Sequence, residues 1–543
     1  MIFTTRPSLI FCAFLFFPVI AFSQHSQMAL TDSLQPAGLK TEYLVEPLGI
    51  DAESPRFSWQ ISDKRPGAKQ SAFELIVTTD PTLKQQHAIV YETGKRNGTA
   101  QMLTYAGRKL KSFTRYFWAV KLWDKNGKES RWSPTASFET GLLKSGDWLG
   151  AWISDGNGVE HKSAPYFRKE LALRKGIRSA RAYIATGGLF ELFVNGQRIG
   201  DHRLDPMYTR FDRRTLYVTH DITGVLQNGL NAFGVVLGNG WYNHQSTAVW
   251  NFHQAPWRAR PAFCMDIRIE YHDGTVETYG TGKDWKTSAD GPLLFNSIYT
   301  AEHVDARKTL SGWNRPGFID SAWQAVTLRS APSRNIVHQS LHPIRSTEEI
   351  PAKAMRKFSD SVFVFDMGRN IAGVSRLRVR GEAGTVIRLT HGERLNPDGR
   401  VDQSNIDVHY RPVGEGDPFQ TDIFILAGNG VEEFMPSFNY KGFQYVELRA
   451  SKPIRLEASS LTAFFMHSDV PVKGRVSSSN PLLDKIWMAT NNSYLSNLYG
   501  YPTDCPQREK NGWTGDAHIA IETGLYNFDA ITVYEKWLAD HRD

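Results

Sequence analysis

The sequence contains little cysteine and, beyond its first residues, no long apolar run. Of its three cysteines, Cys12 lies in the N-terminal apolar stretch, while Cys264 and Cys505 are far apart. This distribution suggests neither a disulfide framework nor a cysteine-based metal cluster, so stability must come from hydrophobic cores. No segment after the N-terminus is apolar enough to span a bilayer or repetitive enough to be low-complexity, so neither a membrane span nor a disordered chain is expected.

Clusters of basic residues are missing as well. The net charge of +7 is spread over 543 residues without a Lys/Arg-rich block or a basic and aromatic pattern, so no nucleic-acid partner is expected. What is present, 41% hydrophobic and 22% charged residues, is typical of folded globular protein. The chain is longer than the roughly 250–300 residues at which one hydrophobic core stops growing, so several domains are expected.

The N-terminus has the order of a secretory leader. A basic residue, Arg6, precedes an apolar run over Leu9–Phe22, and the small residue Ser23 follows that run. This pattern predicts a signal peptide over residues 1–23, a mature chain that begins near Gln24, and a secreted or periplasmic protein. An uncleaved membrane anchor is the alternative, but the run is shorter than the roughly 20 residues that a span requires.

We assign residues 24–145 to a first β-domain, a fibronectin-like sandwich. Its segments Arg56–Ile61 and Tyr116–Trp123 are short and rich in β-branched and aromatic residues, with turn residues between them. Because aromatic side chains on strands bury large apolar areas, Trp59 and Trp118 are predicted to be core residues rather than sugar platforms.

Residues 146–341 are predicted to form a jelly-roll domain similar to carbohydrate-binding domains. Leu189–Val194 alternates in polarity before Asn195-Gly196, a dipeptide that tolerates the positive φ angles of a tight hairpin. Two interpretations of this domain's polar and aromatic turn residues stay open, a sugar-binding face or ordinary turn chemistry. They concern Asp205, Tyr208, Asp212 and the glycine-rich Gly238–Asn243.

A third β-sandwich is predicted over residues 342–468, where alternating segments such as Ser375–Arg380 are separated by Gly and Pro turns. The periodicity then changes to that of helices in residues 469–543. Asn480 is a good N-cap, and Pro481 is a favoured first helical residue. Near the end, Tyr534, Trp537 and Leu538 form an apolar stripe with nothing after it to cover it, which predicts that the chain stops inside a domain.

The loop between the expected helices holds the densest chemistry. Within Tyr501–Asp516 lie three carboxylates together with Arg508 and Trp513. Like charges in a shared site raise one another's pKa, and such a conflict is often functional. A glycosidase needs a carboxylic acid that donates a proton to the departing oxygen, together with ionised groups that bind ring hydroxyls. The alternative is a surface loop with a salt bridge between Arg508 and one acid.

The same loop resembles the active-site signature of bacterial α-L-rhamnosidases, glycoside hydrolase family 78. That pattern is Asp-Cys-Pro-x-Arg-Glu followed by Gly-Trp-x-Gly-Asp, and all of its fixed residues are present between Asp504 and Asp516. The resemblance extends upstream and covers nearly the whole chain after the leader. It includes the segments Leu44–Asp51, Pro55–Trp59, Leu192–Gly196, Phe365–Asn370 and His391–Arg394.

The resemblance implies that Glu509 is the general acid of an inverting enzyme that releases terminal α-L-rhamnose from oligosaccharides, polysaccharides or glycosides. It also implies that rhamnose is bound by four residues of the loop, Asp504, Arg508, Trp513 and Asp516. By resemblance, residues 469–543 are the first part of an (α/α)₆ barrel, and no metal or organic cofactor is needed.

By the same resemblance, the general base is a glutamate beyond Asp543, so this chain is expected to show little or no activity by itself. A base-free chain retains only part of the roughly 10²–10⁴-fold effect of acid–base catalysis. The alternative is that the chain is a non-catalytic, carbohydrate-binding remnant of such an enzyme.

Overall fold

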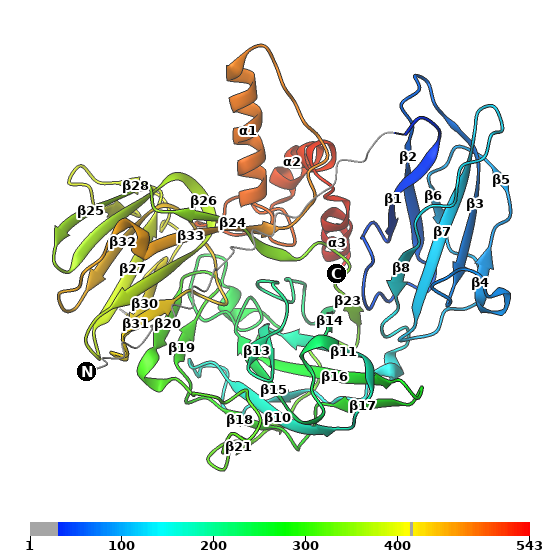
Figure 1. The fold of residues 1–543 in the computed structure, drawn as a ribbon. Coiled ribbons are helices and arrows are strands. Elements are labelled where there is room, and N and C mark those ends of the chain that lie inside the picture. Colours follow the sequence, from blue (N-terminus) through cyan, green and yellow to red (C-terminus); the bar gives the residue numbers. More distant parts are fainter. Residues whose placement is uncertain (1–30, 413–415) are drawn as a thin grey trace, which may run out of the picture.

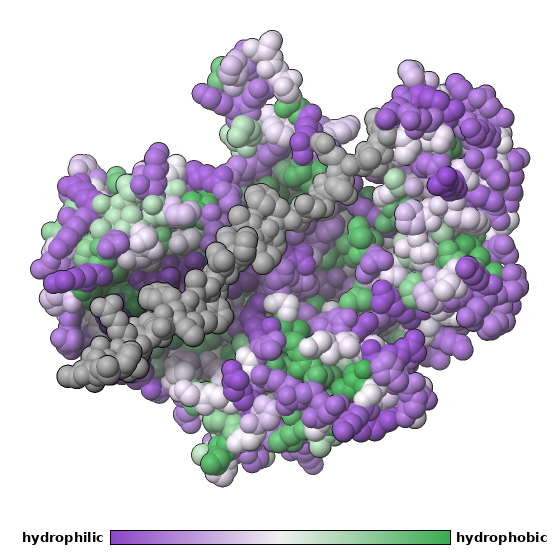
Figure 2. Space-filling view, viewed as in Figure 1, coloured by the Kyte–Doolittle hydropathy of each residue, from purple (hydrophilic) through white to green (hydrophobic). Residues whose placement is uncertain are grey.

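The computed structural model describes residues 31–412 and 416–543, so the predicted leader lies outside the described residues. Figure 1 shows three β-domains and a small group of helices, which lie between the first domain and the third. The outer faces of the β-domains are mainly hydrophilic in the view of Figure 2. None of the helices among the described residues is long and apolar enough to cross a membrane.

The first domain is a two-sheet sandwich, as predicted. Trp59 is 2% exposed and Trp118 is 0% exposed, so both indoles are core residues, as expected. They pack with Phe57, Leu75 and other apolar side chains between the sheets. One sheet has the order β1(Gln35–Thr41), β2(Arg56–Ser62), β6(Met102–Thr104); the other has the order β4(Ile89–Glu92), β3(Gln70–Thr78), β7(Arg115–Asp124), β8(Ala136–Glu139), with β5(Arg96–Asn97) paired to β3.

The second domain also has two facing sheets with a continuous apolar core between them. Asn195 and Gly196 have φ angles of 52° and 85° and join two antiparallel strands, which confirms the predicted tight hairpin. The six-stranded sheet has the order β13(Gln197–Arg198), β12(Leu189–Val194), β15(Gly229–Gly238), β10(Tyr166–Leu173), β18(Lys286–Ser288), β21(Gln324–Ala325). The seven-stranded sheet has the order β22(Thr327–Leu328), β9(Ile153–Ser154), β16(Ala262–Tyr271), β11(Ile177–Gly187), β14(Thr215–Asp221), β23(Ile336–His338), with β17(Val276–Gly280) paired to β16.

The third domain is built on one large sheet. Its strand β26(Val362–Arg380) continues over 19 residues and pairs with several neighbours. The order is β19(Leu293–Asn296), β20(Glu302–Asp305), β30(Thr421–Ile425), β27(Val386–Gly392), β32(Lys441–Ala450), β26(Val362–Arg380), β33(Leu461–Ser468), β24(Ile344–Pro351), with β25(Ala354–Ser359) and β31(Val431–Phe434) on β26 and a separate ribbon of β28(Arg394–Leu395) and β29(Val401–Asp402). Strands β19 and β20 come from the preceding stretch of chain, so the second and third domains share this sheet.

Three helices follow: α1(Pro481–Ser496), α2(Thr514–Asn527) and α3(Ile531–Arg542). Helix α1 begins as predicted, with the Asn480 side chain accepting a hydrogen bond from the Leu482 N–H. The mostly β fold with a helical C-terminal part is therefore confirmed.

The prediction of an uncovered apolar stripe on the last helix is wrong for Tyr534. This residue is 4% exposed, and its hydroxyl group lies 3.3 Å from that of Tyr494 on α1. Leu538 is exposed, as predicted. The more extended exposed apolar surface lies instead on the first half of α1, at Leu482 and Ile486, where the helix projects from the molecule in Figure 1.

Candidate active site

The signature loop connects α1 to α2 and closes on itself. The Asp504 N–H donates to the Asn511 carbonyl at 3.0 Å, and the Lys510 N–H donates to the Cys505 carbonyl at 3.1 Å. Lys510 has a φ angle of 58°, an uncommon conformation for a residue other than glycine, which turns the chain back on itself. The backbone therefore brings the acids at positions 504 and 509 into one compact loop.

Glu509 is held from two sides. Its Oε2 accepts a hydrogen bond from Trp513 Nε1 at 2.8 Å, and its Oε1 lies 3.4 Å from His409 Nε2. Arg508 Nε is 3.8 Å from the same Oε1 atom. Because only 15% of the Glu509 side chain is exposed, the carboxyl group does not point into bulk water.

Asp504 pairs with Asn511 where the loop closes, and its Oδ1 accepts a hydrogen bond from the Asn511 N–H at 3.2 Å. Burial raises the pKa of its carboxyl group, and the nearby charge of Glu509 raises it further. The Cys505 thiol donates a hydrogen bond to Asp504 Oδ2 at 2.9 Å. Burial, followed by the neighbouring carboxylate, raises the pKa of the Cys505 thiol to about 12, so the sulfur stays protonated and is a poor nucleophile at neutral pH.

The other predicted site residues are more open. The Arg508 side chain is 42% exposed and Trp513 is 48% exposed. Asp516 lies in the first turn of α2 and is exposed. The structure thus brings together Glu509, Arg508 and Trp513, places Asp504 beside them, and places Asp516 in the exposed first turn of α2.

The loop is anchored from behind by buried groups. Lys510 is 0% exposed, and its ammonium group donates to the carbonyl oxygens of Ile298 and Tyr440. Burial holds the pKa of Lys510 well below its usual value. The Tyr299 hydroxyl donates to the Arg508 carbonyl at 2.7 Å, and the Tyr501 hydroxyl donates to the Lys510 carbonyl at 3.0 Å. These contacts fix the backbone on both sides of Glu509.

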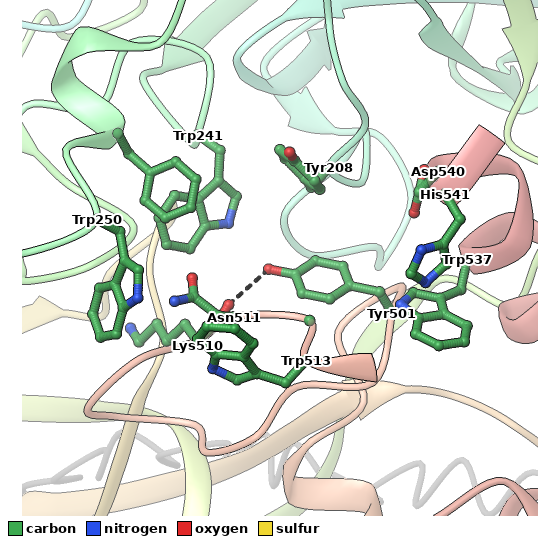
Figure 3. A pocket seen from close by; sticks show the side chains of 12 residues that line it. Tyr208, Trp241, Trp250, Tyr501, Lys510, Asn511, Trp513, Trp537, Asp540 and His541 are labelled. Carbon is green, nitrogen blue, oxygen red and sulfur yellow. Dashed lines mark hydrogen bonds between the residues drawn. The ribbon is translucent and has the colours of Figure 1, made fainter. Parts of the chain in front are cut away.

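A pocket of about 350 Å³ adjoins this loop (Figure 3). Three parts of the chain contribute to its walls: the second domain, the signature loop and α3. The lining residues are Tyr208, Trp241, Trp250, Phe252, Tyr501, Lys510, Asn511, Gly512, Trp513, Trp537, Asp540 and His541. Glu509 adjoins the pocket through Trp513 on one side and, on the other, through His409, whose ring lies 4.7 Å from that of Trp250.

The residues considered for a sugar-binding face in the second domain separate into two groups. Asp205 is 3% exposed and contacts His202 and Gln339, and Asp212 lies beside Arg210. These two acids therefore have structural partners. Tyr208 and Trp241, in contrast, line the pocket beside the signature loop.

Sequence reasoning missed His409 and Trp250. Both come from irregular segments, and they meet because the backbone of Ala248 pairs with that of Tyr410 across two domains. A single histidine in a long loop has no periodicity or motif from which such a contact can be predicted. The pocket could not be predicted from the sequence either, because its walls come from residues separated by up to several hundred positions.

The arrangement is suited to proton transfer beside an aromatic surface. A mostly buried carboxyl group is oriented by an indole N–H and an imidazole, and a guanidinium lies close enough to stabilise the carboxylate left after proton donation. In the described part of the chain, no group of three or more His, Cys, Asp or Glu side chains is arranged to hold a metal ion.

Comparison with known domain families gives four successive matches. Residues 36–144 match the Rha78A-like N-terminal immunoglobulin domain, and residues 175–348 match the alpha-L-rhamnosidase N-terminal domain. Residues 356–467 match the bacterial alpha-L-rhamnosidase concanavalin-like domain, and residues 471–543 match the bacterial alpha-L-rhamnosidase 6 hairpin glycosidase domain. The matches follow the order of the three β-domains and the helices.

Comparison with individual proteins agrees. An alpha-L-rhamnosidase of Formosa agariphila is 33% identical over 96% of this chain, which spans 57% of that protein. The solved alpha-L-rhamnosidase from Dictyoglumus thermophilum has a TM-score of 0.87 and 34% identity, with 95% of this chain and 58% of that chain covered. The Streptomyces avermitilis enzyme, solved in complex with L-rhamnose, has a TM-score of 0.87 and 27% identity, with 94% and 65% covered.

Proposed function

Because the chain belongs to the bacterial α-L-rhamnosidase family, we propose that its signature loop is the proton-donating half of an active site that hydrolyses terminal α-L-rhamnosides. The observation that carries the proposal is the placement of Glu509, held by Trp513 and His409 beside an aromatic pocket. The relative solved with L-rhamnose supports rhamnose as the sugar.

In this proposal Glu509 carries a proton when the substrate binds and transfers it to the glycosidic oxygen as the bond to the sugar breaks. The Trp513 N–H occupies Oε2, so the proton is held at Oε1. After transfer, the carboxylate is stabilised by the Trp513 hydrogen bond and by the Arg508 guanidinium. Asp504, Arg508, Trp513 and Asp516 bind the rhamnose ring, the indole through its face and the charged groups through hydroxyls.

We propose that hydrolysis inverts the anomeric centre. An inverting glycosidase needs a base on the other face of the sugar, roughly 6.5–9.5 Å from the acid, to activate a water. We assign that role to none of the acids of the signature loop, and propose that the base is a carboxylate from elsewhere in the helical domain. The whole protein's substrates are then rhamnose-containing glycans or glycosides.

A binding titration tests the sugar assignment. We expect L-rhamnose to bind saturably in calorimetry or by tryptophan fluorescence, and binding to be lost in Trp513→Ala and weakened in Asp504→Asn. Trp132→Ala is the matched control, because Trp132 is an exposed indole on the first domain. Absence of rhamnose binding, or equal binding of D-mannose, would contradict the proposal.

Hydrolysis distinguishes an enzyme from a carbohydrate-binding protein without catalysis. Both hypotheses predict rhamnose binding, but only an enzyme releases rhamnose from 4-nitrophenyl α-L-rhamnoside. In any preparation that turns over, proton NMR of the first product should show β-L-rhamnose. Appearance of the α-anomer first would refute inversion while leaving the sugar assignment in place.

We also propose that the protein is exported, on the basis of the leader expected over residues 1–23. Expression with this segment should give a periplasmic or secreted product whose mass corresponds to a chain beginning near Gln24. A product of full mass that stays with the membrane fraction would favour the uncleaved anchor instead.

A further inference from the structure

A second cavity, with a volume of about 490 Å³, is formed by loops of the second domain. Three of the side chains that line it are arginines, Arg258, Arg260 and Arg329, and Tyr242 is its one aromatic lining residue. We call it the arginine cavity. It shares no lining residue with the pocket beside the signature loop, but the two are neighbours, because the consecutive residues Trp241 and Tyr242 line one each. Its volume is within the roughly 300–1,000 Å³ that is typical of small-molecule sites.

One arginine of the cavity has a structural role. Arg260 is 5% exposed, and its guanidinium donates to Asp155 Oδ1 at 2.9 Å and to Asp155 Oδ2 at 2.7 Å. The same group donates to the carbonyl oxygens of His161 and Ser163. The charge of Arg260 is therefore balanced by Asp155, and most of its N–H groups are in use.

The other two arginines keep N–H groups that a ligand can use. Arg258 Nε donates to Asn243 Oδ1 at 3.1 Å and its Nη1 donates to Glu160 Oε1 at 2.8 Å, whereas its Nη2 has no hydrogen-bond partner among the described residues. The exposed side chain of Arg329 has neither a hydrogen bond nor an ion pair within residues 31–412 and 416–543. The wall of the cavity therefore carries a positive charge that no acidic side chain balances.

Tyr242 adds a buried hydroxyl group to the wall. The residue is 5% exposed, and its ring packs against that of Phe211 with the centroids 5.2 Å apart. Burial raises the pKa of Tyr242 to about 12, and the nearby charge of Arg329 lowers it only in part, so the hydroxyl keeps its proton at neutral pH. In the described part of the chain this hydroxyl has no hydrogen-bond partner, although most buried polar groups have one. It is a donor that a ligand in the cavity can use.

Two smaller groups complete the unpaired side-chain atoms of the wall, the exposed Ser330 hydroxyl and the Asn157 carbonyl oxygen. Asn157 Nδ2 donates to Asp155 Oδ2 at 2.8 Å, which leaves Asn157 Oδ1 as an acceptor without a donor among the described residues.

This set of groups favours an oxoanion. Most of the unpaired groups are donors, and guanidinium groups bind carboxylate and tetrahedral oxoanions through pairs of N–H groups. The acceptor at Asn157 fits a hydroxyl group carried by the same ligand. A neutral sugar is favoured less, because it gains from the free face of an aromatic ring and the Tyr242 ring is packed on Phe211.

We propose that the arginine cavity is an accessory site for an anionic sugar residue, a uronic acid or a sulfated sugar. Arg329 and Arg258 bind its carboxylate or sulfate group, and the Tyr242 hydroxyl donates to the same group. Asn157 accepts a hydrogen bond from a ring hydroxyl. The proposal goes beyond the proposed function, and only the choice of a sugar as the carrier of the anion rests on it.

Calorimetry at low ionic strength tests the ligand class with four probes: D-glucuronate, D-glucose 6-sulfate, D-glucose and inorganic sulfate. At least one of the two anionic sugars should bind about tenfold or more tightly than D-glucose, as hydrogen bonds to charged groups predict. The same sugar should bind about threefold or more tightly than inorganic sulfate, because Asn157 contacts its ring. Preference for D-glucuronate identifies a carboxylate site, and preference for D-glucose 6-sulfate identifies a sulfate site.

Variants assign the binding to the cavity. Arg329→Gln should weaken binding of the preferred anionic sugar about tenfold, and Tyr242→Phe, which keeps the ring, should weaken it about threefold. Neither variant should change the affinity for L-rhamnose. Arg178→Gln is the matched control, because Arg178 is an exposed arginine of the same domain that pairs with Glu270, and it should leave binding of both sugars unchanged. Thermal unfolding checks that each variant is folded.

Equal binding of D-glucose and both anionic sugars, or full affinity in Arg329→Gln, would overturn the anion site. Inorganic sulfate that binds as tightly as both anionic sugars would overturn the assignment to a sugar. The proposed function is tested separately by L-rhamnose: if L-rhamnose does not bind while the anionic sugar does, the proposed function fails and the anion site stands.

Discussion

The orientation of Glu509 depends on side chains from two different domains. Trp513 is the residue that directly precedes α2 in the helical part, whereas His409 lies in a loop of the third β-domain. A carboxyl group held in this way loses little freedom when substrate arrives, and such pre-organisation is the main advantage that a protein offers to a proton donor. The motif supplies the carboxyl group, and the tertiary fold supplies its orientation.

Replacing Glu509 by glutamine should separate proton donation from binding. In a preparation that hydrolyses rhamnosides, Glu509→Gln should lower kcat on an alkyl rhamnoside by about 10²–10⁴-fold, because a poor leaving group depends on the proton. The loss on 4-nitrophenyl rhamnoside should be much smaller, and the Kd for L-rhamnose should change little. Glu522→Gln, at an exposed position on α2, is the control and should leave both rates unchanged. Equal losses on the two substrates would argue against Glu509 as the acid.

Glu302 should make stability depend on pH. This residue is 1% exposed, its carboxylate accepts hydrogen bonds from the backbone N–H groups of Ser437 and Phe438, and Asp422 and Lys441 lie nearby. Burial raises the pKa of Glu302 from 4.5 to about 7. A raised pKa means that the folded state holds the proton more tightly, so the stabilisation is complete below pH 4.5 and is lost as the pH rises through about 7.

At about 1.4 kcal/mol per pH unit, this effect is at most about 3 kcal/mol across that window. Urea unfolding at several pH values should therefore show a decrease in the free energy of unfolding between pH 4.5 and pH 7 that is absent from Glu302→Gln. The difference between the two proteins is the informative quantity, since other groups titrate in both. Parallel pH profiles for the two proteins would refute this assignment.

At the scale of elements, the sequence predicts what local chemistry determines. The N-cap at Asn480, the hairpin at Asn195-Gly196 and the buried indoles of the first domain follow from patterns a few residues long. The burial of Tyr534 and the joining of β19 and β20 to the third sheet do not, because they depend on contacts between distant segments. Likewise the signature loop is visible in the sequence, whereas His409 and the pocket are not.

The close approach of α1 and α2 depends on a glycine. A Cβ atom at Gly524 would clash with the Tyr494 hydroxyl and would lie 2.8 Å from its Cζ and 3.0 Å from Tyr534 Cε2. These rings are buried and cannot move away easily, so Gly524→Ala should lower the free energy of unfolding by about 1–2 kcal/mol despite its better helix propensity. Gly515→Ala is the matched control in the same helix, because nothing lies within 4 Å of its Cβ position.

Thermal and urea unfolding measure both variants. We expect Gly515→Ala to leave stability unchanged or to raise it by up to about 1 kcal/mol, as an exposed helical alanine does. If Gly524→Ala is as stable as Gly515→Ala, α1 and α2 do not pack closely at Gly524.

At the scale of the whole molecule, the pocket exists only because the domains are docked. Ion pairs connect the first domain to the helices through Arg56 and Glu535 at 2.5 Å, and the second domain to α3 through Arg214 and Asp540 at 2.6 Å. The shared sheet joins the second and third domains. A change that loosens one domain is therefore expected to affect the site, even when it lies far from Glu509.

The contact between the first two domains is the clearest test of this coupling. Glu139 on β8 and Arg181 on β11 form two hydrogen bonds of 2.9 Å, and both residues are 7% exposed. Glu139→Gln leaves a buried guanidinium without its charged partner and should lower the free energy of unfolding by about 3 kcal/mol. This value is the lower end of the usual range, because Asp221 still contacts Arg181.

The double variant Glu139→Leu/Arg181→Met should lose less stability than Glu139→Gln, since it buries no unpaired charge. Glu270→Gln, which breaks a solvent-exposed pair with Arg178, should cost less than about 1 kcal/mol. Urea unfolding measures all three, and a loss in Glu139→Gln no larger than in Glu270→Gln would show that this ion pair does not hold the two domains together.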